Sequence, residues 1–375
     1  MRTELAKIST NFNGTQCYVH ARGVFKENGF GIITMQKLEL SGCDLFHGIE
    51  FITTNDFGKN FSEPKSSEGL KRRYFPEGKS EVMCDATPFY HKKTGKIILI
   101  GHLATYIGDK GDPKQKSTTY AIFDEETGDF TPVSTIEIPD ENSEKYYIVG
   151  SGCSQIYETE SGELLIPIYF RSLDSDLHFY VAIMRCSFDA EKITLLEIGN
   201  DITTKEPRGF CEPSIIKFNN EYYIALRNDV SGYIAKSYDG IHIEEPIKLC
   251  FDDGEDLGNY NTQQHWIAGG NKLWLVYTRR TENNEHVFRH RAPLFMAELE
   301  PNTMRILRST ERIVVPERGA RLGNFGCQSY NDEIGYVFAS EWMQGDNGLE
   351  GCQKYGSDNS IFITKLLFEQ ENNER

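Results

Sequence analysis

Short apolar runs and polar turns alternate along nearly the whole chain. The runs are rich in Val, Ile, Tyr and Phe, and Gly, Asn or Asp separates them. This pattern is typical of β-strands joined by tight turns, and helical periodicity is nearly absent. The sequence therefore predicts an all-β protein.

One unit of this pattern occurs six times: an apolar strand, a turn of Gly or Asn/Asp type, and a second, more apolar strand. The turns of these hairpins centre near Gly29, Gly95, Gly162, Asn220, Gly270 and Asp332. Successive turns lie 66, 67, 58, 50 and 62 residues apart. Repetition at a period of about 61 residues in an all-β chain indicates a radial array of four-stranded sheets.

We therefore predict that residues 1–375 form one six-bladed β-propeller. A propeller must protect the seam of its ring, so we expect the last apolar run, residues 359–368, to pair with the N-terminal strand. A large β-sandwich is the alternative, but it would not explain such regular spacing.

Charge and cysteine content narrow the class of partner. Acidic residues outnumber basic ones by 56 to 40, which gives a net charge of −16. A diffuse negative field repels phosphate backbones, so we expect no nucleic-acid partner. Nine cysteines, an odd number without C-x-x-C spacing, indicate neither a disulfide framework nor a zinc ribbon. With no signal-peptide pattern or membrane-length run, we expect a cytoplasmic protein without a membrane partner, or a secreted or periplasmic one if a signal peptide has been removed.

The sequence also lacks the usual cofactor signatures. No H-x-H or H-E-x-x-H spacing, Gly-rich phosphate loop, nucleophile elbow or dinucleotide fingerprint occurs. We therefore expect neither a metal nor an organic cofactor. The 19 Tyr, 23 Phe and 3 Trp instead favour strands and a carbohydrate-binding surface.

Two short motifs match the Asp-box pattern S/T-x-D-x-G-x-x-W/F. Residues 54–61 match it well, and residues 237–243 match it loosely, with the glycine displaced. In this motif the aspartate bonds its own turn and the glycine takes a positive φ. We interpret Asp56 and Asp239 as structural residues whose value is diagnostic of the fold.

With these motifs, the chain resembles the sialidase superfamily along most of its length. Arg22, near the start of the first hairpin, is similar to the first arginine of the family's carboxylate-binding triad. Asp44, ten residues before the first Asp-box, resembles the acid/base aspartate. Glu212 and Arg227 look like the catalytic glutamate and second arginine of the fourth blade, and Arg291 lies where the third arginine falls. Residues 150–169 resemble a stretch of the family's third blade.

One departure from the family concerns the nucleophile. Sialidases use a tyrosine at the start of the last blade, where this chain has Gly323, Asn324 and Phe325. Tyr330 lies several residues late and would serve only if the last blade were shifted in register. The resemblance therefore implies the fold, and we expect a poor sialidase.

The same residues suggest carbohydrate chemistry on their own terms. Cleaving a glycosidic bond needs a proton donor and a second carboxylate or nucleophile across the sugar ring. We expect Asp44 to be the general acid, Glu212 the base or charge-stabilising carboxylate, and Asp85 a reserve acid. Without a tyrosine, water would attack directly in an inverting reaction.

Arginines from several blades would bind a planar carboxylate in bidentate fashion, which favours an acidic sugar. We expect Arg22, Arg227 and Arg291 to form this clamp, with ion pairing between blades as the alternative. Arg280 and Arg321, in a further basic stretch, are candidate substrate-binding residues.

The leading prediction is thus an exo-glycoside hydrolase that acts on a terminal, acidic sugar of an oligosaccharide. A polysaccharide lyase on the same fold is one alternative, with His102 or His265 as the base. A non-catalytic glycan-binding propeller is another, with Trp266, Tyr169 and Phe325 as stacking platforms.

Overall fold

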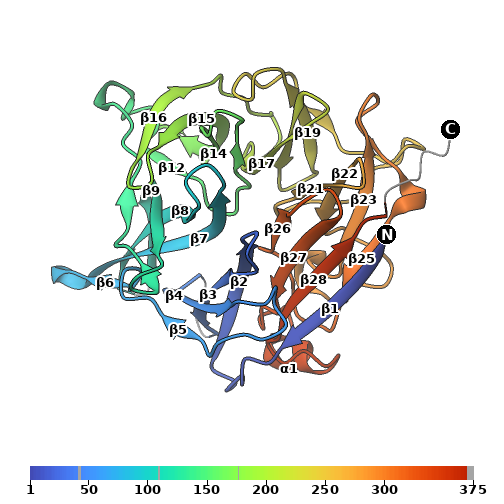
Figure 1. The fold of residues 1–375 in the computed structure, drawn as a ribbon, viewed down its shortest axis with the longest axis horizontal. Coiled ribbons are helices and arrows are strands. Elements are labelled where there is room, and N and C mark those ends of the chain that lie inside the picture. Colours follow the sequence, from blue (N-terminus) through green and yellow to red (C-terminus); the bar gives the residue numbers. More distant parts are fainter. Residues whose placement is uncertain (41–43, 109, 176, 370–375) are drawn as a thin grey trace.

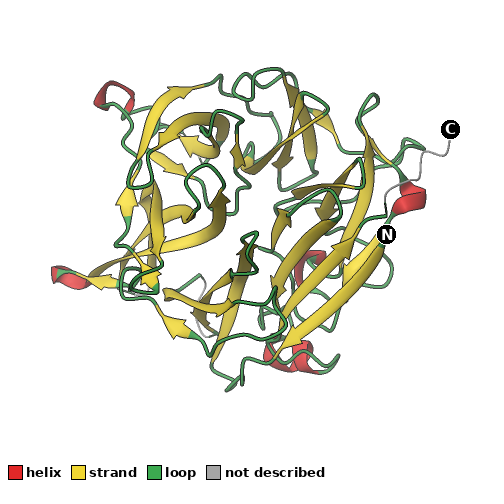
Figure 2. Cartoon of the chain, viewed as in Figure 1, coloured by secondary structure: helices red, strands yellow, loops and turns green. Residues whose placement is uncertain are grey.

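Six blades of β-strands surround a central axis in the computed structural model of the chain (Figure 1). The structure describes residues 1–40, 44–108, 110–175 and 177–369. Strands make up almost all of the regular structure, and helices are confined to a few short turns (Figure 2). The predicted six-bladed β-propeller is confirmed.

The first three blades follow one another from the N-terminal side. Blade 1 contains β2 (Gln16–Phe25), β3 (Gly31–Glu39), β4 (Phe46–Thr54) and β5 (Lys65–Ser66). Blade 2 contains β6 (Arg73–Tyr74), β7 (Lys79–His91), β8 (Lys96–Ile107), β9 (Lys110–Asp124), β10 (Asp129–Phe130) and β11 (Ser134–Thr135). Blade 3 contains β12 (Ile148–Gly150), β13 (Tyr157–Glu158), β14 (Leu164–Arg171), β15 (Tyr180–Phe188) and β16 (Ile193–Ile198).

The remaining blades and helices complete the ring. Blade 4 contains β17 (Cys211–Phe218), β18 (Glu221–Arg227), β19 (Tyr233–Ser237) and β20 (Ile247–Lys248). Blade 5 contains β21 (His265–Gly269), β22 (Lys272–Tyr277), β23 (Leu294–Glu300), β24 (Arg305–Ile306) and β25 (Arg312–Val315). Blade 6 contains β26 (Gly326–Ser329), β27 (Ile334–Ser340), β28 (Ile361–Leu367) and β1 (Arg2–Ile8). The helices are η1 (Pro76–Gly78), η2 (Asp140–Asn142), η3 (Phe288–His290), η4 (Arg308–Thr310) and α1 (Gly348–Gln353).

The six predicted hairpin turns occupy equivalent places. Each joins the innermost strand of a blade to the next strand outward: β2 to β3, β7 to β8, β13 to β14, β17 to β18, β21 to β22 and β26 to β27. Blade 3 differs in that its innermost strand is split into β12 and β13, both paired with β14. The turns therefore gather at one end of the axis, and the starts of the innermost strands gather at the other.

The ring closes within blade 6. Strand β1 pairs antiparallel with β28, from Arg2 opposite Leu367 to Ile8 opposite Ile361. The predicted closure by the last apolar run is confirmed. Blades 2 and 3 are also continuous, because β12 pairs with β9 at Ile148 and Lys116.

The apolar core lies between neighbouring blades. Ile267, Trp274 and Val337 pack together where blades 5 and 6 meet, and similar clusters fill the other contacts between blades. Both Asp-boxes follow the third strand of a blade, where the Asp56 and Asp239 carboxylates accept bonds from their own turns. Their structural interpretation agrees with these contacts.

Candidate functional site

The innermost segment of every blade has one backbone irregularity, within the strand or shortly before it. His20, Asp85, Cys153, Glu212 and Asn324 have φ values of 58°, 53°, 57°, 46° and 69°, and Asn261 just before β21 has 52°. Each belongs to a different blade. Bulges interrupt the pairing beside three of them, in β2, β7 and β17. Left-handed backbone is costly for residues other than glycine and concentrates at functional sites, where a bulge re-aims a side chain.

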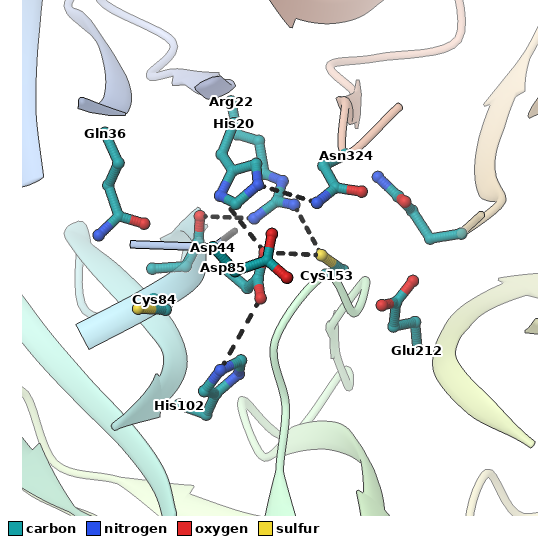
Figure 3. A network of polar contacts seen from close by, with 12 residues as sticks. His20, Arg22, Gln36, Asp44, Cys84, Asp85, His102, Cys153, Glu212 and Asn324 are labelled. Carbon is teal, nitrogen blue, oxygen red and sulfur yellow. Dashed lines mark hydrogen bonds and ion pairs between the residues drawn. The ribbon is translucent and has the colours of Figure 1, made fainter. Parts of the chain in front are cut away.

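Asp85 is the centre of one polar network (Figure 3). Its Oδ1 lies 3.3 Å from His20 Nδ1 and accepts a bond from the Cys153 thiol at 3.1 Å, and its Oδ2 lies 3.8 Å from His102 Nε2. Burial alone would raise the pKa of the Asp85 carboxyl, but His20, His102 and the Arg22 guanidinium hold it well below its usual range. Asp85 is therefore ionised at neutral pH.

His20 lies between Asp85 and Asn324. Its Nε2 is 2.8 Å from the Asn324 amide nitrogen, which donates to it, so Nδ1 carries the proton that faces Asp85. Burial lowers the pKa of His20 to about 4, even though Asp85 acts in the opposite direction. The imidazole is consequently neutral at physiological pH.

Arg22 is completely buried below this network. Its Nε donates to the Phe325 carbonyl at 3.2 Å, and its two terminal nitrogens contact the Ala86 carbonyl and the Cys153 sulfur, each at 3.0 Å. These partners belong to blades 6, 2 and 3. The nitrogens of the Arg22 guanidinium thus contact groups of the protein, and the side chain connects blade 1 with these three blades.

Three further arginines form a second group, the arginine cluster (Arg227, Arg291 and Arg321). Arg227 is ion-paired with Glu212 and donates to the Asn261 side-chain oxygen at 2.7 Å. Arg291 reaches the same oxygen at 3.2 Å and also bonds the Asn261 backbone carbonyl. One asparagine therefore holds two guanidinium groups together.

Positive charge is concentrated in the arginine cluster. Burial, together with the charges of Arg227 and Arg321, lowers the pKa of Arg291 to about 9. Burial has the same tendency at Arg227, but Glu212 more than offsets it and raises that pKa. Arg321 packs 3.6 Å from the centroid of the Trp342 ring and donates to Gln344. The cluster is locally cationic in a protein with a net charge of −16.

Glycines permit the close approach of these side chains. A Cβ on Gly323 would lie 2.7 Å from Arg291 Cδ, and one on Gly152 would lie 2.2 Å from His102 Nδ1. Figure 3 shows the Asp85 network and Glu212 facing the same central region. The starts of all six blades thus contribute to one polar site.

Comparison with known proteins rests on structure. No protein-family model matches the chain, and no curated protein matches it. A protein of unknown function from Dyadobacter fermentans superposes with a TM-score of 0.67 at 13% identity, covering 97% of this chain and 99% of that one. A Trypanosoma rangeli sialidase in complex with sialic acid superposes with a TM-score of 0.63 at 11% identity, covering 98% of this chain and 59% of that one. A Hadza microbial sialidase superposes with a TM-score of 0.62 at 10% identity, covering 94% of this chain and 66% of that one. The fold is that of the sialidase propeller. The chain spans about three fifths of the length of these two sialidases.

Within this propeller, the structure brings some of the predicted site residues together and places others elsewhere. It brings Arg227, Arg291 and Arg321 together near Glu212, and it places Asp85 and His102 in the neighbouring network. Arg280 is exposed and pairs instead with Glu285.

Asp44 and His265 have different surroundings. Asp44 is exposed, follows residues 41–43, which lie outside the described part of the chain, and its carbonyl accepts a bond from the Tyr106 hydroxyl. Figure 3 draws Asp44 with the Asp85 network.

His265 is buried between the Ser214 hydroxyl at 2.8 Å and the Phe325 carbonyl at 3.2 Å, and burial lowers its pKa to about 3. Its two ring nitrogens are thus engaged with neighbouring blades.

The start of the last blade agrees with the expected departure from the family. Asn324 occupies it, and the oxygen of its side chain is buried without a hydrogen-bond partner among the described residues. Tyr330 lies at the opposite end of β26, beside the hairpin turn, with its hydroxyl 3.5 Å from the Glu27 carbonyl. No shift in register brings Tyr330 to Glu212.

Sequence reasoning missed His20, Cys153 and Asn261 as site residues. Each is a polar residue shortly before the apolar hairpin segment of its blade, the position that Asp85 and Glu212 occupy in their blades. That shared position was the available signal. The proposed stacking residues Trp266, Tyr169 and Phe325 are all buried in the blades.

Two further features concern the described part of the chain. It contains no group of three or more His, Cys, Asp or Glu side chains arranged to hold a metal ion. None of its helices is long and apolar enough to cross a membrane.

Proposed function

We propose that the protein is a glycoside hydrolase that acts on a terminal acidic sugar and binds the sugar carboxylate at the arginine cluster. The arrangement around Asn261 carries this proposal. Glu212 is already paired with Arg227, and no carboxylate of the described residues pairs with Arg291. A planar carboxylate from a ligand would supply the missing negative charge and accept bonds from both guanidinium groups.

Three acidic residues have different roles in the proposed reaction. One oxygen of Glu212 is buried without a hydrogen-bond partner among the described residues, which suits it to stabilise positive charge on the sugar ring. Asp85, ionised and held by His20 and Cys153, reinforces that negative field. Asp44 is exposed and serves as the proton donor to the leaving group in this proposal.

Water is the attacking group in the proposed reaction, because Asn324 stands where the family has its tyrosine. The unpartnered Asn324 oxygen would accept a hydrogen bond from that water or from a sugar hydroxyl. Direct attack inverts the configuration at the anomeric carbon.

Binding of sugar acids tests the proposal before any substrate is known. Calorimetry with sialic acid, glucuronic acid and their uncharged counterparts should show binding of an acid form only. Arg291→Lys should weaken that binding about tenfold or more, because charge is kept and fork geometry is lost. Arg2→Lys, in an exposed ion pair on β1, is the matched control and should bind like the wild type.

Turnover then separates the reaction classes. Sialosides, uronosides and neutral glycosides would be screened for released sugar and for ultraviolet absorbance. Hydrolysis releases a sugar without new absorbance, whereas elimination creates an absorbing unsaturated uronate. Equal binding of charged and uncharged sugars would contradict the carboxylate site, and absorbing products would replace hydrolysis by elimination.

A further inference from the structure

A tyrosine, a histidine and a glutamate form a chain of contacts beside the arginine cluster. The Tyr260 hydroxyl lies 2.5 Å from His290 Nδ1, and His290 Nε2 lies 3.4 Å from a carboxylate oxygen of Glu285. Arg280 holds both oxygens of that carboxylate, at 2.6 and 2.9 Å. Tyr260 and His290 are both half-buried, so the chain of contacts is reachable from solvent.

The backbone ties this chain of contacts to the arginine cluster. Tyr260 directly precedes Asn261, and His290 directly precedes Arg291. In each pair, the first residue belongs to the chain of contacts, and the second belongs to the arginine cluster or holds it together. Arg289 and His290 in η3 both have left-handed backbone, with φ values of 54° and 51°. Left-handed backbone is costly for residues such as these, and strained residues concentrate at functional sites.

The hydrogen bonds define where the protons lie. The Glu285 carboxylate can only accept, so it favours the ring proton on Nε2, which leaves Nδ1 of His290 to accept a bond from the phenol. Burial raises the pKa of Tyr260, which keeps the phenol protonated until a base takes the proton, while the charges of Arg280, Arg291 and Arg289 act in the opposite direction. A side chain that can lose a proton, a base within bonding distance and a third group that orients the base are the parts of an activated catalytic group.

We propose that Tyr260 is a further catalytic residue, which relays a proton from the attacking water to His290. The proposal rests on the proposed function, because the sugar is the one bound at the arginine cluster. The water oxygen bonds to the anomeric carbon while the glycosidic C–O bond breaks. One water proton passes to the Tyr260 oxygen, and the phenolic proton passes to His290 Nδ1. Asp44 protonates the leaving oxygen, and Glu285 balances the imidazolium.

A chemical probe tests the activated phenol without any sugar. An aryl sulfonyl fluoride that carries a carboxylate, para-fluorosulfonylbenzoate, would be incubated with the protein and the modified tyrosines mapped by mass spectrometry. The phenolic oxygen bonds to sulfur, fluoride leaves, and the proton goes to His290. Tyr260 should react roughly 100-fold faster than Tyr238, which is 89% exposed. His290→Gln should abolish the difference, and Glu285→Gln should reduce it. Equal rates at the two tyrosines would overturn the proposal.

Turnover tests the catalytic role. On any glycoside that the wild type hydrolyses, Tyr260→Phe should lower kcat roughly 100-fold with little change in KM, and Tyr238→Phe should change neither. A normal kcat for Tyr260→Phe would overturn the relay even if the phenol proves reactive. If no glycoside is hydrolysed, the proposed function fails, and the labelling rates still decide whether Tyr260 is activated.

Discussion

The two ends of the propeller axis are built from the same sixfold repeat and use it differently. At the turn end, positive φ values fall mainly on glycine, as at Gly29 with 89° and Gly162 with 81°. At the strand-start end they fall on residues such as His20, Asp85 and Glu212. Glycine reaches this conformation without steric cost, whereas other residues are strained there. Backbone strain is therefore low where the chain only reverses direction, at turns of glycine and asparagine, and higher where side chains must meet on the axis.

The contacts at the two ends differ in kind as well. The turn end surrounds a cavity of about 640 Å³ whose lining includes Phe25, Phe89 and Ile215. Nearby, the Gln155 and Gln328 amides each bond both backbone groups of a residue in another blade: Gln155 of blade 3 bonds Trp266 of blade 5, and Gln328 of blade 6 bonds Phe25 of blade 1. Such bonds join blades without charge. The strand-start end instead contains ion pairs and shared hydrogen bonds. The uncharged bonds that join blades and the charged groups that could act on a ligand therefore lie at opposite ends of the axis.

Replacing Arg22 should break this contrast most severely. Arg22→Met removes a buried charge that satisfies two carbonyls and faces Asp85, so the free energy of unfolding should fall by about 3–5 kcal/mol. The matched control is Lys26→Met, just after the same strand, where the side chain pairs with the half-exposed Glu125. That change should cost only about 0–1 kcal/mol. Denaturant unfolding of both variants measures the difference, and equal losses would show that Arg22 does not hold the blades together.

The contrast also explains which parts of the fold could be predicted. Turn chemistry is local, so glycine, asparagine or aspartate between two apolar runs was enough to locate all six hairpins. Both Asp-box turns followed from short motifs in the same way, and the closure by β28 followed from the last apolar run and the need to protect the seam of the ring. The splitting of the innermost strand of blade 3 around Cys153 was not predictable, because it depends on contacts with Asp85 and Arg22 in other blades.

The site was predictable only in part for the same reason. Resemblance to a family located Glu212, Arg227 and Arg291, which the structure brings together. It gave no means of foreseeing that Arg280 would pair with Glu285, or that both ring nitrogens of His265 would be engaged between blades. A bulge or a left-handed residue is set by packing between segments far apart in the chain, and a single sequence carries only a weak signal of it.

The pH dependence of stability should sharpen the comparison. Burial lowers the pKa of His20 to about 4 and that of His265 to about 3, whereas imidazoles of an unfolded chain titrate near 6.5. Between those values the unfolded state binds more protons, so stability is full above pH 6.5 and falls as pH decreases toward 4. Each histidine contributes up to about 1.4 kcal/mol per pH unit in that window.

Unfolding at pH 7, 6 and 5 measures this slope. His265→Asn should make it shallower, because one buried neutral imidazole is gone. Asp85 does not cancel the effect, since a carboxyl with a lowered pKa loses its contribution only below about pH 4. A flat profile for the wild type would mean that the two imidazoles are not buried in their neutral form.

The smallest expected effect lies in the turns between outer strands, at the first Asp-box. The Asp56 carboxylate accepts bonds from the Asn60 side chain and from the backbone of Lys59 and Asn60, and these bonds lower its pKa to about 2. Asp56→Asn keeps the shape and removes the charge, so it should lower stability slightly at pH 7. The deficit should shrink as pH falls from about 4 toward 2, because the wild-type carboxylate is then protonated too. Glu282→Gln, at an exposed carboxylate after Arg280, should change unfolding little at either pH. Asp56→Asn should leave the binding of sugar acids unchanged, because this Asp-box lies on an outer turn. Weakened binding would mean that a change in an outer turn affects the site on the axis.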